Sequence, residues 1–63
     1  MIDSYASALS TKLAFFGFTY NPLSRGDIES LCLSNVSLDD AYGIACDVAA
    51  GFSIEESVAA MFA

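Results

Sequence analysis

The sequence contains no histidine and only two cations, Lys12 and Arg25, against eight aspartates and glutamates, which gives a net charge of −6. Without histidine, the usual general base and the Ser–His and Cys–His pairs of nucleophilic catalysis are missing. None of the four glycines forms a phosphate-binding loop with Lys and Ser or Thr. Two cations are too few to neutralise nucleic-acid phosphates or to hold an anionic membrane surface. We therefore expect no enzyme, no cofactor, no direct nucleic-acid binding and no membrane association.

Cysteine is also scarce, with only Cys32 and Cys46 present. Two thiolates cannot complete a tetrahedral zinc site, so we expect no metal. Two cysteines are enough for one disulfide, but disulfides are typical of secreted proteins. The chain does not open with the basic and apolar segments of a secretory signal. Both cysteines lie among apolar residues, where free cysteine behaves as a small buried hydrophobe. These features favour free, buried thiols in a cytoplasmic protein.

Long hydrophobic runs are absent, since the most conspicuous run is LAFFGF and a membrane helix needs roughly 18 residues. Hydrophobic residues nevertheless make up 56% of the chain, above the ordinary share of about 45–50%. A chain of 63 residues buries only about 60% of the surface that its unfolded form exposes. We expect a single domain over residues 1–63 whose surplus apolar surface is covered by a second copy, as a homodimer, or by another protein.

The spacing of apolar residues predicts four helices, over residues 3–16, 25–33, 38–50 and 54–62. No segment alternates strictly enough to predict a strand. The fold class is therefore all-α, a compact bundle of four short helices. The residues expected to face inward are Ala6, Leu9, Leu13 and Phe16; Ile28, Leu31 and Cys32; and Leu38, Ala41, Tyr42, Ala45, Val48 and Ala49. The apolar residues of the last helix are Ile54, Val58, Met61 and Phe62.

The first three helices are expected to end in the same way. A residue suited to the left-handed conformation is followed in each case by an apolar residue that can fold back onto the helix. These pairs are Gly17 with Phe18, Asn35 with Val36, and Gly51 with Phe52.

The acidic residues gather at helix starts. Three serines are each followed three residues later by an acid, which is the spacing of a capping box. The pairs are Ser24 with Asp27, Ser37 with Asp40, and Ser53 with Glu56. Asp3, Asp39 and Glu55 also fall in or just before a first turn, where the helix dipole favours negative charge, so that only Glu29 and Asp47 lack this explanation. If the helix starts converge in space, the same acids could instead mimic DNA phosphates.

The segment FFGFTY places four aromatic residues within six positions at a helix end. One short helix end cannot turn all four inward, and exposed aromatic residues are favoured at the centres of protein interfaces. We expect Phe15, Phe18 and Tyr20 to contact a partner, with Met61 and Phe62 as a second candidate patch.

The sequence resembles two known families, one over a single segment and one over the whole chain. AAGFSIEESVAAMF, over residues 49–62, is similar to the first loop and second helix of ubiquitin-associated domains, although it lacks their Met before Gly. A helix that ends on glycine and an aromatic residue accounts for that likeness without kinship. The whole chain, from MIDSYASALSTKL to SVAAMFA, resembles in length and style the small acidic early proteins of lambda-like phages, encoded between the excisionase and exonuclease genes. That resemblance implies a helical, non-enzymatic accessory protein that alters host replication or the lysis–lysogeny choice through protein contacts.

The leading hypothesis from the sequence is thus a small regulatory protein that binds another protein, such as a bacterial host protein. Two alternatives stay open, a structural module that only assembles with itself and an acidic DNA mimic that inhibits a DNA-binding protein.

Overall fold

The computed structural model describes residues 2–61. Within them lie four helices and no strand: α1 (Ile2–Phe15), α2 (Arg25–Leu33), α3 (Leu38–Ala49) and α4 (Ile54–Met61). The predicted all-α class is confirmed for this part of the chain, and the described helix bounds differ from the predicted ones by one residue at most. Phe62, the expected end of the last helix, lies outside the described residues. No helix in residues 2–61 is long and apolar enough to cross a bilayer.

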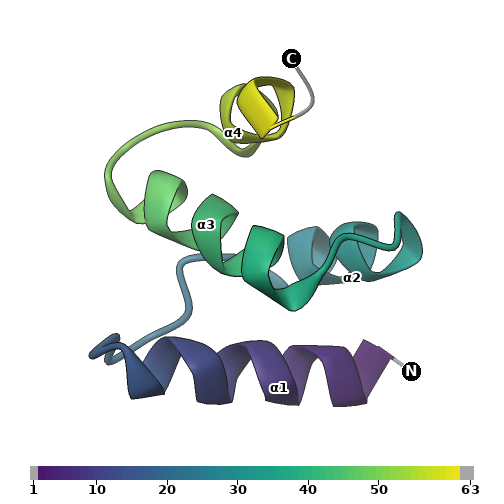
Figure 1. Ribbon diagram of the computed structural model, residues 1–63, viewed down its shortest axis with the longest axis vertical. Coiled ribbons are helices and arrows are strands. Elements are labelled where there is room, and N and C mark those ends of the chain that lie inside the picture. The colour runs from purple at the N-terminus through teal and green to yellow at the C-terminus, as the bar shows by residue number, and fades with distance from the viewer. Residues whose placement is uncertain (1, 62–63) are drawn as a thin grey trace.

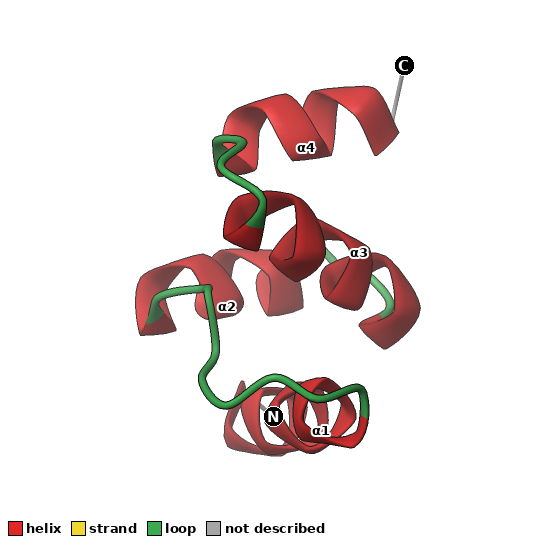
Figure 2. Ribbon diagram, turned by 90° about the vertical axis from the view of Figure 1, so that its left-hand side faces the viewer, coloured by secondary structure: helices red, strands yellow, loops and turns green. Residues whose placement is uncertain are grey.

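The helices stack in layers (Figure 1). The base is α1, against which both α2 and α3 pack, and α4 packs on α3. Figure 2 shows α4 at the opposite end of the molecule from α1, with α2 and α3 between them. Because α4 is supported mainly by α3, its side toward α2 is left open.

The core forms where α1, α2 and α3 meet. Its buried apolar residues are Leu9, Leu13, Leu23, Ile28, Leu31, Val36, Ala41, Ile44 and Ala45. Ile44 is fully buried but was not among the expected inward residues. The buried face of α3 therefore extends beyond the row of residues that the apolar spacing singled out.

Four residues expected in the interior lie elsewhere. Phe16 is 54% exposed and Ala49 is also exposed; Phe16 follows the last residue of α1, and Ala49 is the last residue of α3. Cys32 and Cys46 are free, as expected, but only half-buried, so the prediction that they are buried was wrong. Each is flanked on its helix by more deeply placed residues, Leu31 and Ala45 respectively.

The three predicted helix ends adopt left-handed conformations, with φ of 97° at Gly17, 58° at Asn35 and 107° at Gly51. In each case the next residue donates its amide to a carbonyl five residues back, at 3.0 Å, which is the bond pattern of a Schellman motif. The apolar residues that follow these three turns differ in how far they are exposed to solvent. Val36 is buried, Phe18 is half-buried, and Phe52 remains 56% exposed.

All three predicted capping serines accept an amide hydrogen bond from the residue three positions on. Ser24 Oγ accepts from Asp27 and Ser37 Oγ from Asp40, at 3.2 and 3.1 Å. Only at the third start do the bonds run both ways, where Ser53 N donates to Glu56 Oε1 at 3.0 Å and Glu56 N donates to Ser53 Oγ at 3.1 Å. Glutamate has one methylene more than aspartate and therefore reaches back to the N-cap amide.

Two hydrogen bonds of partly buried side chains connect elements, in addition to the exposed bond that Arg25 of α2 donates to Asp3 of α1. The Tyr5 hydroxyl donates to the Val36 carbonyl at 2.8 Å, which ties α1 to the α2–α3 turn. Ser57 Oγ donates to Asp47 Oδ2 at 2.7 Å, which ties α4 to α3. Asp47, which does not lie at a helix start, thus has a structural role as the acceptor of this second bond.

Candidate protein-binding surfaces

Two aromatic rings project at the carboxyl end of α1. Phe15 is 83% exposed and Phe16 54%, and their rings meet edge to face with centroids 5.3 Å apart. Phe16 lies in turn on Tyr42 of α3, at 4.8 Å between centroids. Together Phe15, Phe16 and Tyr42 form a continuous aromatic cluster, hereafter the aromatic surface. It is held to α3 on one side and open on the other.

A cation borders the aromatic surface. Lys12 Nζ lies 5.6 Å from the centroid of the Phe16 ring and 5.8 Å from that of Tyr42, within the range of cation–π attraction. The same ammonium group contacts Asp39 Oδ1 at 2.8 Å. This hydrogen bond and the positive charge of Lys12 lower the pKa of Asp39. The aromatic surface therefore has an apolar centre and a paired charge at its rim, beside a shallow hollow of about 600 Å³.

The residues that the sequence singled out as contacts do not form one surface. Phe15 belongs to the aromatic surface, whereas Phe18 is half-buried and supports it from the core side, edge to face with Tyr42 at 6.4 Å. Tyr20 is 63% exposed but lines a separate hollow with Phe18. Met61 is partly buried against the core, on α4 at the opposite end of the molecule (Figure 1).

Phe62, the second residue of the predicted Met61 patch, lies outside the described residues. Sequence reasoning missed Phe16 as a surface residue because helical spacing from Leu9 and Leu13 assigned it to the core. The signal that could have found it is Gly17: α1 ends before Phe16, so helical periodicity no longer applies there.

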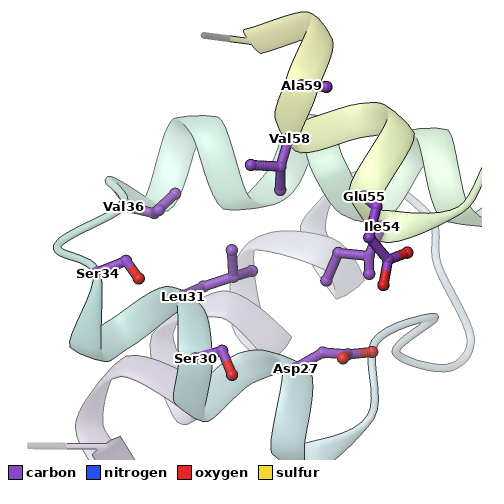
Figure 3. Close-up of a pocket in the computed structure, with 9 residues that line it drawn as sticks. All are labelled: Asp27, Ser30, Leu31, Ser34, Val36, Ile54, Glu55, Val58 and Ala59. Carbon is purple, nitrogen blue, oxygen red and sulfur yellow. The ribbon is translucent and has the colours of Figure 1, made fainter.

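A second surface lies between α2 and α4, where the structure has a groove of about 560 Å³ (Figure 3). Its apolar lining consists of Leu31, Val36, Ile54, Val58 and Ala59, and its polar lining of Asp27, Ser30, Ser34 and Glu55. We call this the α2–α4 groove. No sequence pattern pointed to it, because its two walls lie 18 or more positions apart in the chain.

The charges around the groove are of one sign. Asp27 from α2 and Glu55 from α4 lie at the same end (Figure 3). Neither cation of the chain lines the groove, because Lys12 pairs with Asp39 and Arg25 with Asp3. The hydrogen bond and charge of Arg25 lower the pKa of Asp3.

Within the described residues, no group of three or more Cys, Asp or Glu side chains is placed to hold a metal ion. The two surfaces offer apolar and charged contacts, which suit the binding of another macromolecule. No protein-family model matches this chain, and no curated protein or solved structure matches it either.

Proposed function

We propose that this protein is a non-enzymatic binding protein that acts through protein–protein contacts, and that the aromatic surface is where its partner docks. The observation that carries the proposal is the position of Phe15, whose ring is 83% exposed yet rests against Phe16. An exposed ring of this size contributes little to the stability of the chain itself.

The chemistry of the aromatic surface supports this role. An aromatic side chain buries about 150–250 Å² when it is fully covered, and it has only two side-chain torsions to order. The Phe16 ring lies on the Tyr42 ring, with 4.8 Å between their centroids, and this contact restricts the side-chain torsions of Phe16 before a partner binds. The Lys12–Asp39 pair at the rim can exclude water and orient the partner, as polar rims do around interface hot spots.

The biological setting that we propose is the one implied by the resemblance to early proteins of lambda-like phages. The protein would then act in the host cytoplasm as an accessory factor, and its partner would be a host protein in replication or in the lysis–lysogeny choice. The support for this setting is the size, acidity and helical character of the chain.

Self-association is the second candidate function. It is favoured by the number of large apolar residues that a chain of this size leaves exposed. These are Phe15, Phe16, Tyr20, Leu33 and Phe52. Two copies could bury the aromatic surface against itself in an isologous dimer. DNA mimicry has less support, because a mimic needs a regular row of free carboxylates, whereas Asp3, Asp39 and Asp47 are engaged by other side chains.

The test compares Phe15→Ala with Phe52→Ala. Both substitutions remove an exposed phenylalanine, but only the first alters the aromatic surface. Tagged wild-type protein and both variants are used to capture partners from source-organism lysate at low and high salt, and bound proteins are identified by mass spectrometry. Sedimentation of each purified protein gives its oligomeric state.

The proposal expects one partner that is retained at both salt concentrations by the wild type and by Phe52→Ala, and lost from Phe15→Ala. Equal retention by both variants would contradict docking at the aromatic surface. If only the bait is recovered and Phe15→Ala alone converts a dimer to a monomer, self-association is the function. A DNA-binding protein that is released at high salt would favour mimicry, because salt screens charge contacts.

A further inference from the structure

We propose that the α2–α4 groove binds one amphipathic helix of a partner protein, whose apolar stripe enters the groove and whose lysines or arginines meet Asp27 and Glu55. The inference goes beyond the proposed function, because the groove and the aromatic surface share no residue and are borne by different helices. The groove is thus a second, independent binding site with a defined partner chemistry.

The walls of the groove are apolar and already fixed in place. Ile54 and Val58 are four residues apart on α4, so they lie on one face of that helix, and both are half-buried. Leu31 and Val36 form the opposite wall and belong to the buried core. Figure 3 shows the side chains of Leu31, Ile54 and Val58 directed into the space between the helices.

The groove is open because of how α4 is seated. Ser57, not an apolar residue, is the buried position of α4, and its hydroxyl is bonded to Asp47 of α3. That bond fixes which side of α4 faces α3. Ile54 and Val58, on either side of Ser57 in the sequence, are consequently left beside the groove rather than pressed against α2.

The shape of the groove suits a helix. It lies between two helices of nine and eight residues and has a volume of about 560 Å³. An apolar groove between helices can take the apolar face of a partner helix, read as residues at i, i+3, i+4 and i+7. Ser30 and Ser34, one helical turn apart on α2, add hydroxyls along the groove.

The charge selects a cationic partner. Asp27 and Glu55 lie at one end of the groove (Figure 3), and the chain as a whole carries −6. The starts of α2 and α4 offset each carboxylate by only about half a positive charge, so the end of the groove stays negative. Lys12 and Arg25, the two cations of the chain, are paired elsewhere, which leaves the two acids for a partner's lysine or arginine.

The test uses a synthetic amphipathic peptide of about 18 residues, long enough to form a helix, with Leu at i, i+3, i+4 and i+7 and Lys on the other face. A second peptide carries Glu in place of every Lys. Each is titrated into the full-length protein labelled with ¹⁵N, and amide shifts and dissociation constants are measured. The expected result is that the lysine peptide shifts the amides of the groove residues and that the glutamate peptide does not.

Two matched pairs of variants locate the site. Ala59→Arg fills the groove and adds a cation there, whereas Ala60→Arg makes the same change at an exposed neighbour that does not line the groove. Glu55→Gln and Glu29→Gln each remove one negative charge, but only Glu55 lines the groove. We expect Ala59→Arg to abolish binding and Glu55→Gln to weaken it about three- to tenfold at low salt, with less than twofold change for the two controls.

Several outcomes would overturn the inference. Absence of shifts, equal binding of both peptides, or equal effects of Ala59→Arg and Ala60→Arg would each exclude a cationic helix in the groove. Groove shifts that depend on protein concentration without peptide would identify a second copy as the occupant. Shifts confined to the aromatic surface would leave the proposed function intact and remove only this inference. Phe15→Ala tests whether the two sites are independent: if they are, this variant binds the lysine peptide in the groove as the wild type does.

Discussion

Ser57 Oγ donates a hydrogen bond to Asp47 Oδ2 at 2.7 Å, and Ser57 is the one buried polar residue among those described. This bond joins α4 to α3 through side chains. Because α4 is short and packs mainly on α3, its position depends on few contacts. The same bond orients the face of α4 that borders the α2–α4 groove.

We expect Asp47→Ala to lower the free energy of unfolding by about 1–3 kcal/mol, because it leaves the buried Ser57 hydroxyl without its partner. Glu29→Ala, at an exposed acid of α2, should change it by less than about 0.5 kcal/mol. Urea denaturation gives both values, and amide exchange should show faster opening of α4 in the first variant. Equal effects of the two substitutions would show that the bond does not hold α4.

Tyr5→Phe removes the hydroxyl that bonds the Val36 carbonyl and leaves the ring. The expected loss is about 1 kcal/mol, the usual net value of such a hydrogen bond. Tyr20→Phe makes the same chemical change at a 63% exposed ring and serves as the control. Thermal unfolding of both variants measures the difference. Burial raises the pKa of Tyr5, and a hydrogen bond with Cys46 raises that of Tyr42. Spectroscopic titration of the wild type should therefore show two tyrosines that ionise above their ordinary pKa, and Tyr5→Phe should remove one of them.

Two glycines should respond to alanine in opposite directions. Gly43 lies inside α3 with open space where a Cβ would fall, so Gly43→Ala should stabilise the protein by about 0.5–1 kcal/mol. Gly51 has a φ of 107°, which a Cβ disfavours, so Gly51→Ala should destabilise it by about 1–2 kcal/mol. Denaturant midpoints report both signs. A stabilising Gly51→Ala would contradict the left-handed helix end.

The hydrogen bond from the Ser53 amide to Glu56 Oε1 predicts a pH dependence. Hydrogen bonds from the Ser53 backbone and side chain lower the pKa of Glu56 below its ordinary value of 4.5. A depressed carboxyl pKa stabilises the fold above the pKa of the unfolded chain, and this contribution is lost as pH falls through the folded-state pKa.

The wild type should therefore be more stable than Glu56→Gln at neutral pH, and the gap should close as pH falls below about 4.5. Urea midpoints of both proteins between pH 7 and pH 3 measure it. A gap that stays constant over this range would show that the charge of Glu56 does not contribute through its capping bond.

The sequence predicted most of the secondary structure because its signals are local. Gly17, Asn35 and Gly51 stop helices by their own conformational preferences, and serine with an acid three residues later starts them. These preferences operate within one turn of chain. The same local reasoning was wrong for Phe16, because a helical period assigns a residue to the core even where the helix has just ended.

The candidate surfaces could be predicted only in part. The crowding of aromatic residues in FFGFTY indicated exposed rings, and Phe15 is one of them. Which rings join depends on Tyr42, which lies on α3 and contacts both Phe16 and Phe18. Nothing in the sequence near Phe15 specifies that contact.

By itself, the sequence determined the four helices, where they begin and end, and the excess of apolar and acidic side chains, because these follow from local backbone preferences and composition. Only the tertiary structure decided where the excess is exposed. The α2–α4 groove exists because Ser57 bonds Asp47 and seats α4 on α3 rather than on α2. A contact between side chains from two helices depends on how those helices pack, and the order of residues along either helix does not contain that information.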